Sequence, residues 1–278
     1  MGSESVKLRT GILLIGSLQW DTNKVREIWR AKQFASDDGI FVKVPICYGR
    51  KSEKRQIYTM IFSPSLPATS FGTALVRRCK GTITSFDDLF REAAELWKAE
   101  SLKSKSPAKG EPLLSAYWGC VSLKPHPRFL MQGSGMTQQE RELRQELLQK
   151  WATTFRQEWE RRKTLERKPR HARREGESPS AVYAFSEMLK AAVNDEGLLQ
   201  IDWPTLPRGT AELEGFDLLL ATVTTPLPKL SEAGYHGPSI IANALKANSA
   251  EATYFTLNER HGITTFQDEQ IKNLLSQH

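Results

Sequence analysis

Apolar residues gather in short runs along the chain, and the first of these runs ends at a glycine. Residues 12–15 (Ile-Leu-Leu-Ile) are followed by Gly16 and Ser17, and an amphipathic segment begins at residue 24. An apolar run bounded by turn residues is typical of a buried strand, whereas apolar positions three and four apart are typical of a helix. The pattern therefore predicts a buried first strand, a tight turn and a helix over 24–35.

Strand-like and helix-like patterns then alternate along the rest of the chain. Strands are expected over 40–48, 57–62, 72–79, 113–123, 197–203 and 216–224, with the last apolar enough to be central. Helices are expected over 86–99, 137–168 and 183–193, and a mixed α/β ending follows over 240–275. Pro45 indicates an edge or a bend within its strand. The alternation predicts an α+β protein.

Two of these helices carry clear local signals. Ser85 precedes the helix at 86–99 and is suited to be its N-cap. In the long helix, Trp151, Phe155 and Trp159 are four residues apart and therefore share one face. We expect this stripe to pack in the core or against a partner helix, rather than to bind a ligand.

The helix at 86–99 and its end carry three candidate acid/base groups. Glu92 lies at the edge of the apolar face, where partial burial would raise its pKa towards neutrality. Glu95 points further from that face, and Glu100 lies near the helix end, where the macrodipole disfavours an anion. We therefore rank Glu92 first and keep Glu95 and Glu100 as alternates. The competing interpretation is that Glu92 belongs to an ordinary helix salt bridge.

The turn and the polar loop that follows residue 48 could together bind a small anion. Gly16 can adopt a positive φ, and with Ser17 it could offer backbone N–H donors to a carboxylate or phosphate. Arg50 or Arg55 could add a guanidinium, which binds a carboxylate through two parallel hydrogen bonds. The alternatives are a plain strand-to-helix connection and solvated loop charges.

The positive charge of the chain is concentrated in one segment. Residues 161–174 contain eight Lys or Arg and one Glu, which equals the formal net charge of +7 for all 278 residues. Such a segment could contact the phosphates of a nucleic acid, but few aromatic residues and no nucleic-acid fold signature accompany it. We therefore expect a solvated helix end and a poorly ordered linker, and we rank nucleic acid as a less favoured partner.

Cysteine and histidine usage gives no sign of a metal or of disulfides. Cys47, Cys79 and Cys120 are far apart, no CxxC occurs, and the five histidines form no recognisable pair. No apolar run approaches the roughly 20 residues that a membrane helix needs. We expect reduced thiols, no metal, no cofactor, no membrane contact and a cytoplasmic location.

Four short motifs follow one another in an order that resembles a known superfamily. They are Ile15-Gly16-Ser17-Leu18 with Trp20 soon after, the Arg- and Ser-containing segment 48–55, Phe-Gly-Thr-Ala-Leu-Val at 71–76, and Arg91-Glu92. Over roughly residues 10–100 the chain resembles the γ-glutamyl cyclotransferase-like superfamily, and most of all its ChaC branch. Two positions depart from it: Ile15 replaces a Tyr, and Leu89 precedes Glu92 by three residues where the family has Leu-x-x-x-Glu.

The resemblance implies a fold for the first part of the chain, while residues 113–278 match nothing assigned in that family. It implies a small mixed β-barrel or sheet with flanking helices, a cyclotransferase-like core over 1–130. We expect the long helix and the basic, flexible linker to occupy 131–180 as an insertion. A C-terminal α/β region over 181–278 would pack on the core.

The resemblance also implies an activity and its residues. A small γ-glutamyl compound would be cyclised to 5-oxoproline by one carboxylate acting as acid and base, without a cofactor. Glu92 would be that carboxylate, and the substrate would lie against Ile15, Gly16, Ser17, Leu18, Arg50 and Arg55. The alternative is a non-catalytic module that binds an anion or a nucleotide on the Gly-Ser turn, with nucleic-acid contact through the basic segment. A buried acid facing Gly16 favours the enzyme, and the absence of a Tyr at position 15 favours the module.

Deletion of residues 168–178 should change the melting temperature little, because the only apolar side chains that it removes are those of Pro169 and Ala172. Thermal unfolding of the full chain and the deletion variant, followed by circular dichroism, measures this. A large drop in melting temperature would mean that the segment docks on the body of the protein.

Overall fold

The apolar run that opens the sequence forms β1 (Leu8–Leu14), the middle strand of a five-stranded sheet. The computed structural model describes residues 6–51, 57–102, 113–115, 118–130, 136–166, 192–207, 211–224, 226 and 235–277. Ile12, Leu13 and Leu14 in β1 are at most 1% exposed. A strand buried on both faces reads as a continuous apolar run, which is why this strand was identifiable.

The sheet is mixed, because its middle strand has an antiparallel and a parallel neighbour. The strand order is β2 (Ile40–Val44), β5 (Gly72–Ile83), β1, β7 (Leu218–Thr224) and β6 (Gly119–Pro125). β1 runs antiparallel to β5 and parallel to β7, so that Leu13 pairs with Val76 on one side and Ala221 on the other. The position of β7 inside the sheet agrees with its apolar sequence.

Pro45 divides the strand expected over 40–48 into two. β2 ends before it, and the chain continues as β3 (Ile46–Lys51), which pairs with β4 (Tyr58–Phe62) in a separate two-stranded hairpin. Proline has no N–H for a ladder, and the chain changes direction there. The α+β class is confirmed. The barrel form of the prediction is wrong for the described strands, because β2 and β6 remain at opposite edges of an open sheet.

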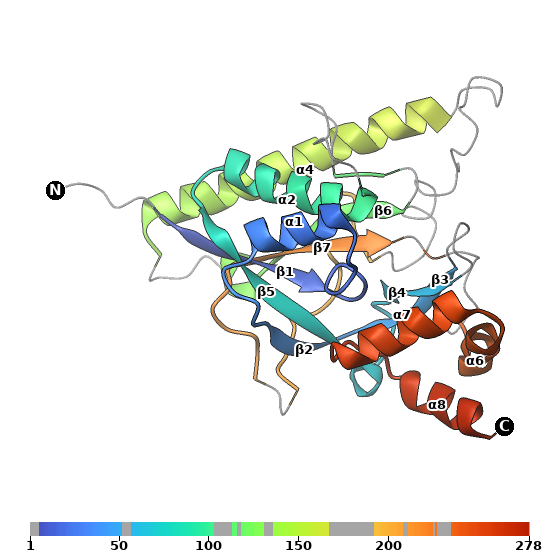
Figure 1. Cartoon of the computed structure of the whole chain (residues 1–278). Coiled ribbons are helices and arrows are strands. Elements are labelled where there is room, and N and C mark those ends of the chain that lie inside the picture. Colours follow the sequence, from blue (N-terminus) through green and yellow to red (C-terminus); the bar gives the residue numbers. More distant parts are fainter. Residues whose placement is uncertain are drawn as a thin grey trace.

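Three helices form layers beside the sheet (Figure 1). α1 (Lys24–Gln33) and α2 (Phe86–Ser101) pack on each other and on β5, and α4 (Gln138–Glu166) packs on α2. Ser85 caps α2 by accepting a hydrogen bond from the Asp88 N–H, as predicted. The stripe on α4 is also confirmed as core, since Trp151 and Phe155 are fully buried.

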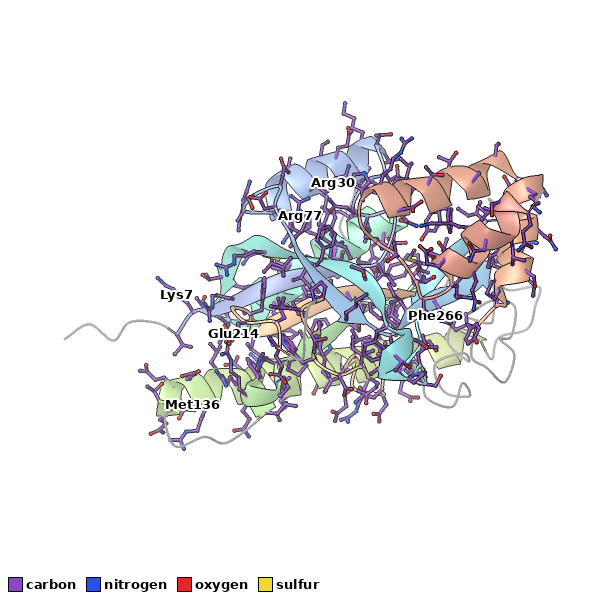
Figure 2. All side chains as sticks on the ribbon, turned by 90° about the horizontal axis from the view of Figure 1, so that it is seen from below. Lys7, Arg30, Arg77, Met136, Glu214 and Phe266 are labelled. Carbon is purple, nitrogen blue, oxygen red and sulfur yellow. The ribbon has the colours of Figure 1, made fainter. Side chains whose placement is uncertain are left out.

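The remaining helices come mostly from the end of the chain. They are α3 (Pro127–Leu130), the 3-10 turn η1 (Ala68–Ser70), α6 (Pro238–Ala247), α7 (Ser249–Arg260) and α8 (Asp268–Ser276). α6 packs on α7 and α8, and these three C-terminal helices lie together at one end of the molecule, away from α4 (Figure 2). Thr264 exchanges backbone hydrogen bonds with Thr73, which ties this group to β5.

Two expected strands differ in the structure. The strand placed over 113–123 begins only at Gly119, whose φ is +148°, because Leu114 pairs back on Cys120. The segment 197–203 forms single bridges rather than a strand. The helix expected over 183–193, apart from its last two residues, and the basic segment from 167 onwards lie outside the described residues. None of the described helices combines the length and the apolar composition that a membrane span requires.

A buried carboxyl opens α8. Asp268 is 4% exposed, and it accepts a hydrogen bond of 2.6 Å from the Thr265 hydroxyl. Burial raises the pKa of Asp268 to about 6, against an opposing effect from that hydrogen bond and from Lys272. Folding therefore favours the protonated form of this side chain.

Asp268→Asn should stabilise the protein at neutral pH. An aspartate in the unfolded chain titrates near pH 3.9, so the contribution of protonated Asp268 to stability is complete below about pH 4. It is lost as the pH rises through about 6, and the shift corresponds to roughly 3 kcal/mol. Because Asn keeps an acceptor for Thr265, the variant should unfold at a higher urea concentration than the wild type at about pH 7.5, with no advantage at about pH 4.

The matched control is Glu269→Gln on the same helix, whose side chain is 81% exposed in the wild type. It should leave the pH dependence of unfolding unchanged. An equal effect of both substitutions would contradict the role of Asp268.

Candidate functional site

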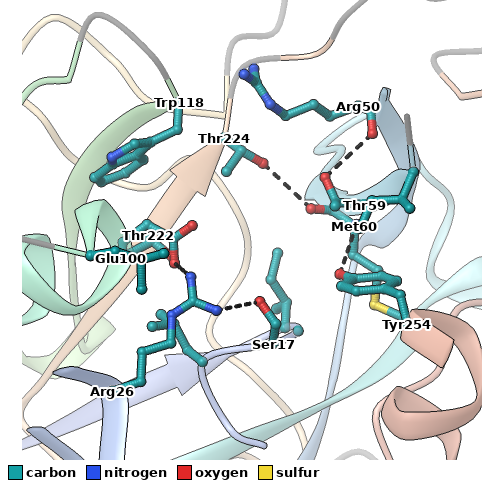
Figure 3. Close-up of a pocket in the computed structure, with 15 residues that line it drawn as sticks. Ser17, Arg26, Arg50, Thr59, Met60, Glu100, Trp118, Thr222, Thr224 and Tyr254 are labelled. Atoms are coloured by element: carbon teal, nitrogen blue, oxygen red, sulfur yellow. Dashed lines mark hydrogen bonds and ion pairs between the residues drawn. The ribbon is translucent and has the colours of Figure 1, made fainter. Parts of the chain in front are cut away.

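A cavity of about 360 Å³ lies where β1 and β7 end. Carboxyl ends of neighbouring parallel strands meet at one edge of a sheet, and ligands commonly bind there in α/β proteins. The turn after β1, the end of α2, the β3–β4 hairpin and α7 complete the wall (Figure 3). The lining residues are Ile15, Gly16, Ser17, Leu18, Arg26, Arg50, Ile57, Thr59, Met60, Glu100, Leu102, Trp118, Thr222, Thr224 and Tyr254.

The Gly-Ser turn forms a single helical turn at this edge. The Gln19 N–H donates to the Gly16 carbonyl at 3.1 Å, and the Asp21 N–H donates to the Ser17 carbonyl at 2.8 Å. None of the described residues accepts a hydrogen bond from the N–H groups of Ser17 and Leu18. The first N–H groups of any helical turn lack an internal partner. These two amides can therefore donate to a ligand.

Gly16 is required for space and not for an unusual backbone angle. We expected that Gly16 could adopt a positive φ, but its φ does not lie in the left-handed region. A Cβ at this position would instead lie 2.7 Å from the hydroxyl oxygen of Tyr254, which reaches the turn from α7. The same hydroxyl accepts a hydrogen bond of 3.4 Å from the Met60 N–H in β4. The turn, α7 and the hairpin thus meet at one point.

Arg26 of α1 lies on the inner wall beside the turn. One of its terminal nitrogens donates to the Ser17 hydroxyl and to the Asp21 carboxylate, both at 2.8 Å. The other is 3.5 Å from the Glu100 carboxylate, and Nε donates to the Ala99 carbonyl at 3.2 Å. The guanidinium therefore joins the turn after β1 to the end of α2.

Glu100 is the carboxylate that the structure brings to the turn. It lines the cavity together with Gly16 and Ser17, and its side chain is 18% exposed. Glu95 pairs with Lys98 at 2.7 Å. Leu96 precedes Glu100 with the Leu-x-x-x-Glu spacing of the family that the sequence resembles. This spacing points to Glu100, whereas the apolar face of the helix points to Glu92.

Glu92 occupies a different environment. It is eight residues before Glu100, which corresponds to about 12 Å along the helix, and it is not among the cavity-lining residues. Its neighbours are the Cys79 thiol and Gly81 of β5. Burial raises the pKa of Glu92, as the sequence suggested, and its Oε2 atom has no hydrogen-bond partner among the described residues.

The other expected binding residues divide into two groups. Ile15, Leu18 and Arg50 line the cavity, with Arg50 reaching it from β3. Arg55 lies outside the described residues. Some lining residues were not predicted from the sequence. Four of them reach the cavity from segments far from the turn in the chain, and the fifth, near the turn, is part of an ordinary amphipathic helix: Trp118, Thr222, Thr224, Tyr254 and Arg26.

The chemistry of the wall suits a small polar organic molecule. The space is surrounded by the Glu100 carboxylate, by the guanidinium of Arg50 in addition to that of Arg26, and by several hydroxyls. Ile15, Ile57 and Met60 add apolar surface. Among the described residues, no three His, Cys, Asp or Glu side chains gather in a way that could hold a metal ion.

Comparisons of the chain with protein-family models, curated proteins and solved structures find no match.

Gly16→Ala should destabilise the protein, because the new methyl group collides with the Tyr254 hydroxyl. Overpacking of this kind costs about 1–3 kcal/mol. Tyr254→Phe removes the oxygen, so in that background Gly16→Ala should cost much less. Urea unfolding of the four proteins of this double-mutant cycle gives the coupling free energy. Strictly additive losses would contradict the close contact.

Proposed function

We propose that this cavity binds a small γ-glutamyl compound and cyclises it to 5-oxoproline, with Glu100 as the acid/base group. The observation that supports this most is the presence of Glu100 and the Gly16–Ser17 turn on one cavity wall. The sequence predicts that a buried acid facing that turn distinguishes the enzyme from the binding module, and Glu100 is a partly buried acid at this position, with 18% of its side chain exposed.

The reaction needs only positioning and one proton carrier. The α-amine of the substrate attacks its own γ-carbonyl carbon, and Glu100 takes a proton from the attacking nitrogen. The bond between the γ-carbon and the leaving nitrogen then breaks, and Glu100 returns the proton to that nitrogen. The products are 5-oxoproline and a free amine, so that atoms and charges balance without a cofactor.

The surrounding groups have roles that follow from their chemistry. The N–H groups of Ser17 and Leu18 would hold an oxygen of the substrate, and a carbonyl that becomes negatively charged gains most from such fixed donors. Arg50, on the opposite wall from Glu100, would hold a carboxylate (Figure 3). The apolar side of the cavity would exclude water from the reacting atoms.

A non-catalytic module that binds an anion or a nucleotide is the second candidate. It is favoured by Ile15, which lines the cavity without the hydroxyl that the resembled family has at this position. In this case the turn N–H groups and Arg50 would bind the anion, and Glu100 would have no role in proton transfer. Nucleic-acid contact through the basic segment remains a prediction from the sequence.

Glu100→Gln should lower the turnover of γ-glutamyl-alanine by about 10²- to 10⁴-fold, which is the range expected for one acid/base group. Gln keeps the size of the side chain but cannot exchange a proton. Formation of 5-oxoproline, measured by liquid chromatography and mass spectrometry, is the assay, and glutathione is tested in parallel.

Glu92→Gln is the matched control on the same helix, and it should retain the turnover of the wild type. Equal losses in both variants would remove the assignment to Glu100. A wild-type protein that forms no 5-oxoproline from either compound would refute the enzyme, and titration calorimetry with small anions would then test the binding module.

A further inference from the structure

Arg26 contacts four groups around the inner wall of the cavity, namely the Ser17 hydroxyl, the Ala99 carbonyl and the carboxylates of Asp21 and Glu100. Its side chain is only 6% exposed, although it carries a permanent charge. A charged group is rarely buried unless it is paired and hydrogen-bonded, because removing it from water is costly. Two carboxylates, Asp21 and Glu100, lie at 2.8 and 3.5 Å from its terminal nitrogens.

Arg26 determines which neighbours donate and which accept hydrogen bonds. A guanidinium has five N–H donors and no acceptor. The Ser17 hydroxyl, at 2.8 Å, must therefore accept from Arg26, and its own hydrogen is left to point elsewhere. Because Ser17 lines the cavity, that hydrogen is available to an oxygen of a ligand. Glu100 in contrast can only accept when it is ionised.

Arg26 also fixes the end of α2 relative to the turn. Its Nε donates to the carbonyl of Ala99, one of the last carbonyls of the helix, which have no partner within the helix itself. The next residue is Glu100. The same guanidinium holds Asp21, the last residue of the turn. The position of Glu100 against Ser17 is thus set by one side chain from α1.

We propose that Arg26 is the positioning residue of this site, one that aligns the Glu100 carboxylate with the Ser17 donor. The effect expected on kcat rests on the proposed function, whereas the effect expected on the position of Glu100 does not. The ligand that fits this pattern places an acceptor oxygen at Ser17 and an amine next to it at Glu100.

A lysine at position 26 should not be able to align these groups as Arg26 does. The lysine ammonium is a single point charge, whereas the planar guanidinium presents its N–H groups in a fixed fork. One ammonium cannot contact Ser17, Asp21, Ala99 and Glu100 at once. The positive charge would remain, but the alignment of the turn with the end of α2 would be lost.

The test compares Arg26→Lys with Arg144→Lys. Arg144 is a second buried arginine, on α4, which pairs with Glu140 and donates to the Arg128 carbonyl. Arg26→Lys should lower kcat for γ-glutamyl-alanine by about 10²-fold, as expected for misplaced reacting groups, with little change in KM. Carbodiimide coupling to Glu100, measured by peptide mass spectrometry, should increase several-fold. Arg144→Lys should leave both measurements unchanged.

A second variant covers the case in which Arg26→Lys does not fold. Arg26→Gln/Asp21→Asn removes one positive and one negative charge together, so the local net charge is unchanged. It should show the same increase in coupling at Glu100. Unchanged coupling in a folded Arg26 variant overturns the proposal. A wild type without turnover refutes the proposed function alone, because the coupling experiment still measures how Glu100 is held.

Discussion

The parallel pairing of β1 with β7 is the interaction on which both the sheet and the cavity depend. Leu13 pairs with Ala221, so the two strands are neighbours in the sheet although they lie far apart in the chain. Parallel strands cannot be joined by a tight turn, and their carboxyl ends meet at the same edge. The turn at Gly16 and the hydroxyls of Thr222 and Thr224 therefore line one space. Without β7, the apolar middle strand would have an unpaired edge.

Helix packing beside the sheet then determines what this space contains. α1 and α2 lie side by side, so a side chain from α1 can reach both the turn after β1 and the last carbonyls of α2. Arg26 makes three hydrogen bonds there, and its charge is balanced by carboxylates from both elements. Partial burial of Arg26, Asp21 and Glu100 costs hydration free energy, and the ion pairs and hydrogen bonds among them offset that cost. This arrangement explains why a charged cluster stands at the inner wall.

Local patterns predicted well wherever a single element could satisfy its own requirements. The cap at Ser85, the length of α2 and the buried stripe at Trp151 and Phe155 depend on residues within one turn of each other. The prediction of a strand over 113–123 was wrong at its start, because contacts beyond a single element decide the structure there. Its first residues fold back on Cys120, an interaction that apolar composition does not reveal. The barrel prediction was wrong for a similar reason, because closure of a sheet into a barrel depends on which strands become neighbours.

The sequence by itself determined the class of the fold, the buried first strand and the position of the Gly-Ser turn at its end. These follow from apolar periodicity and turn chemistry, which act over a few residues. Only the tertiary structure decided which carboxylate meets the turn. Glu92 and Glu100 share one helix, and its local pattern favoured Glu92. The end of α2 nevertheless lies beside Arg26 and the turn, so that Glu100 lines the cavity. The meeting of elements distant in the chain, and not the helix itself, makes that choice.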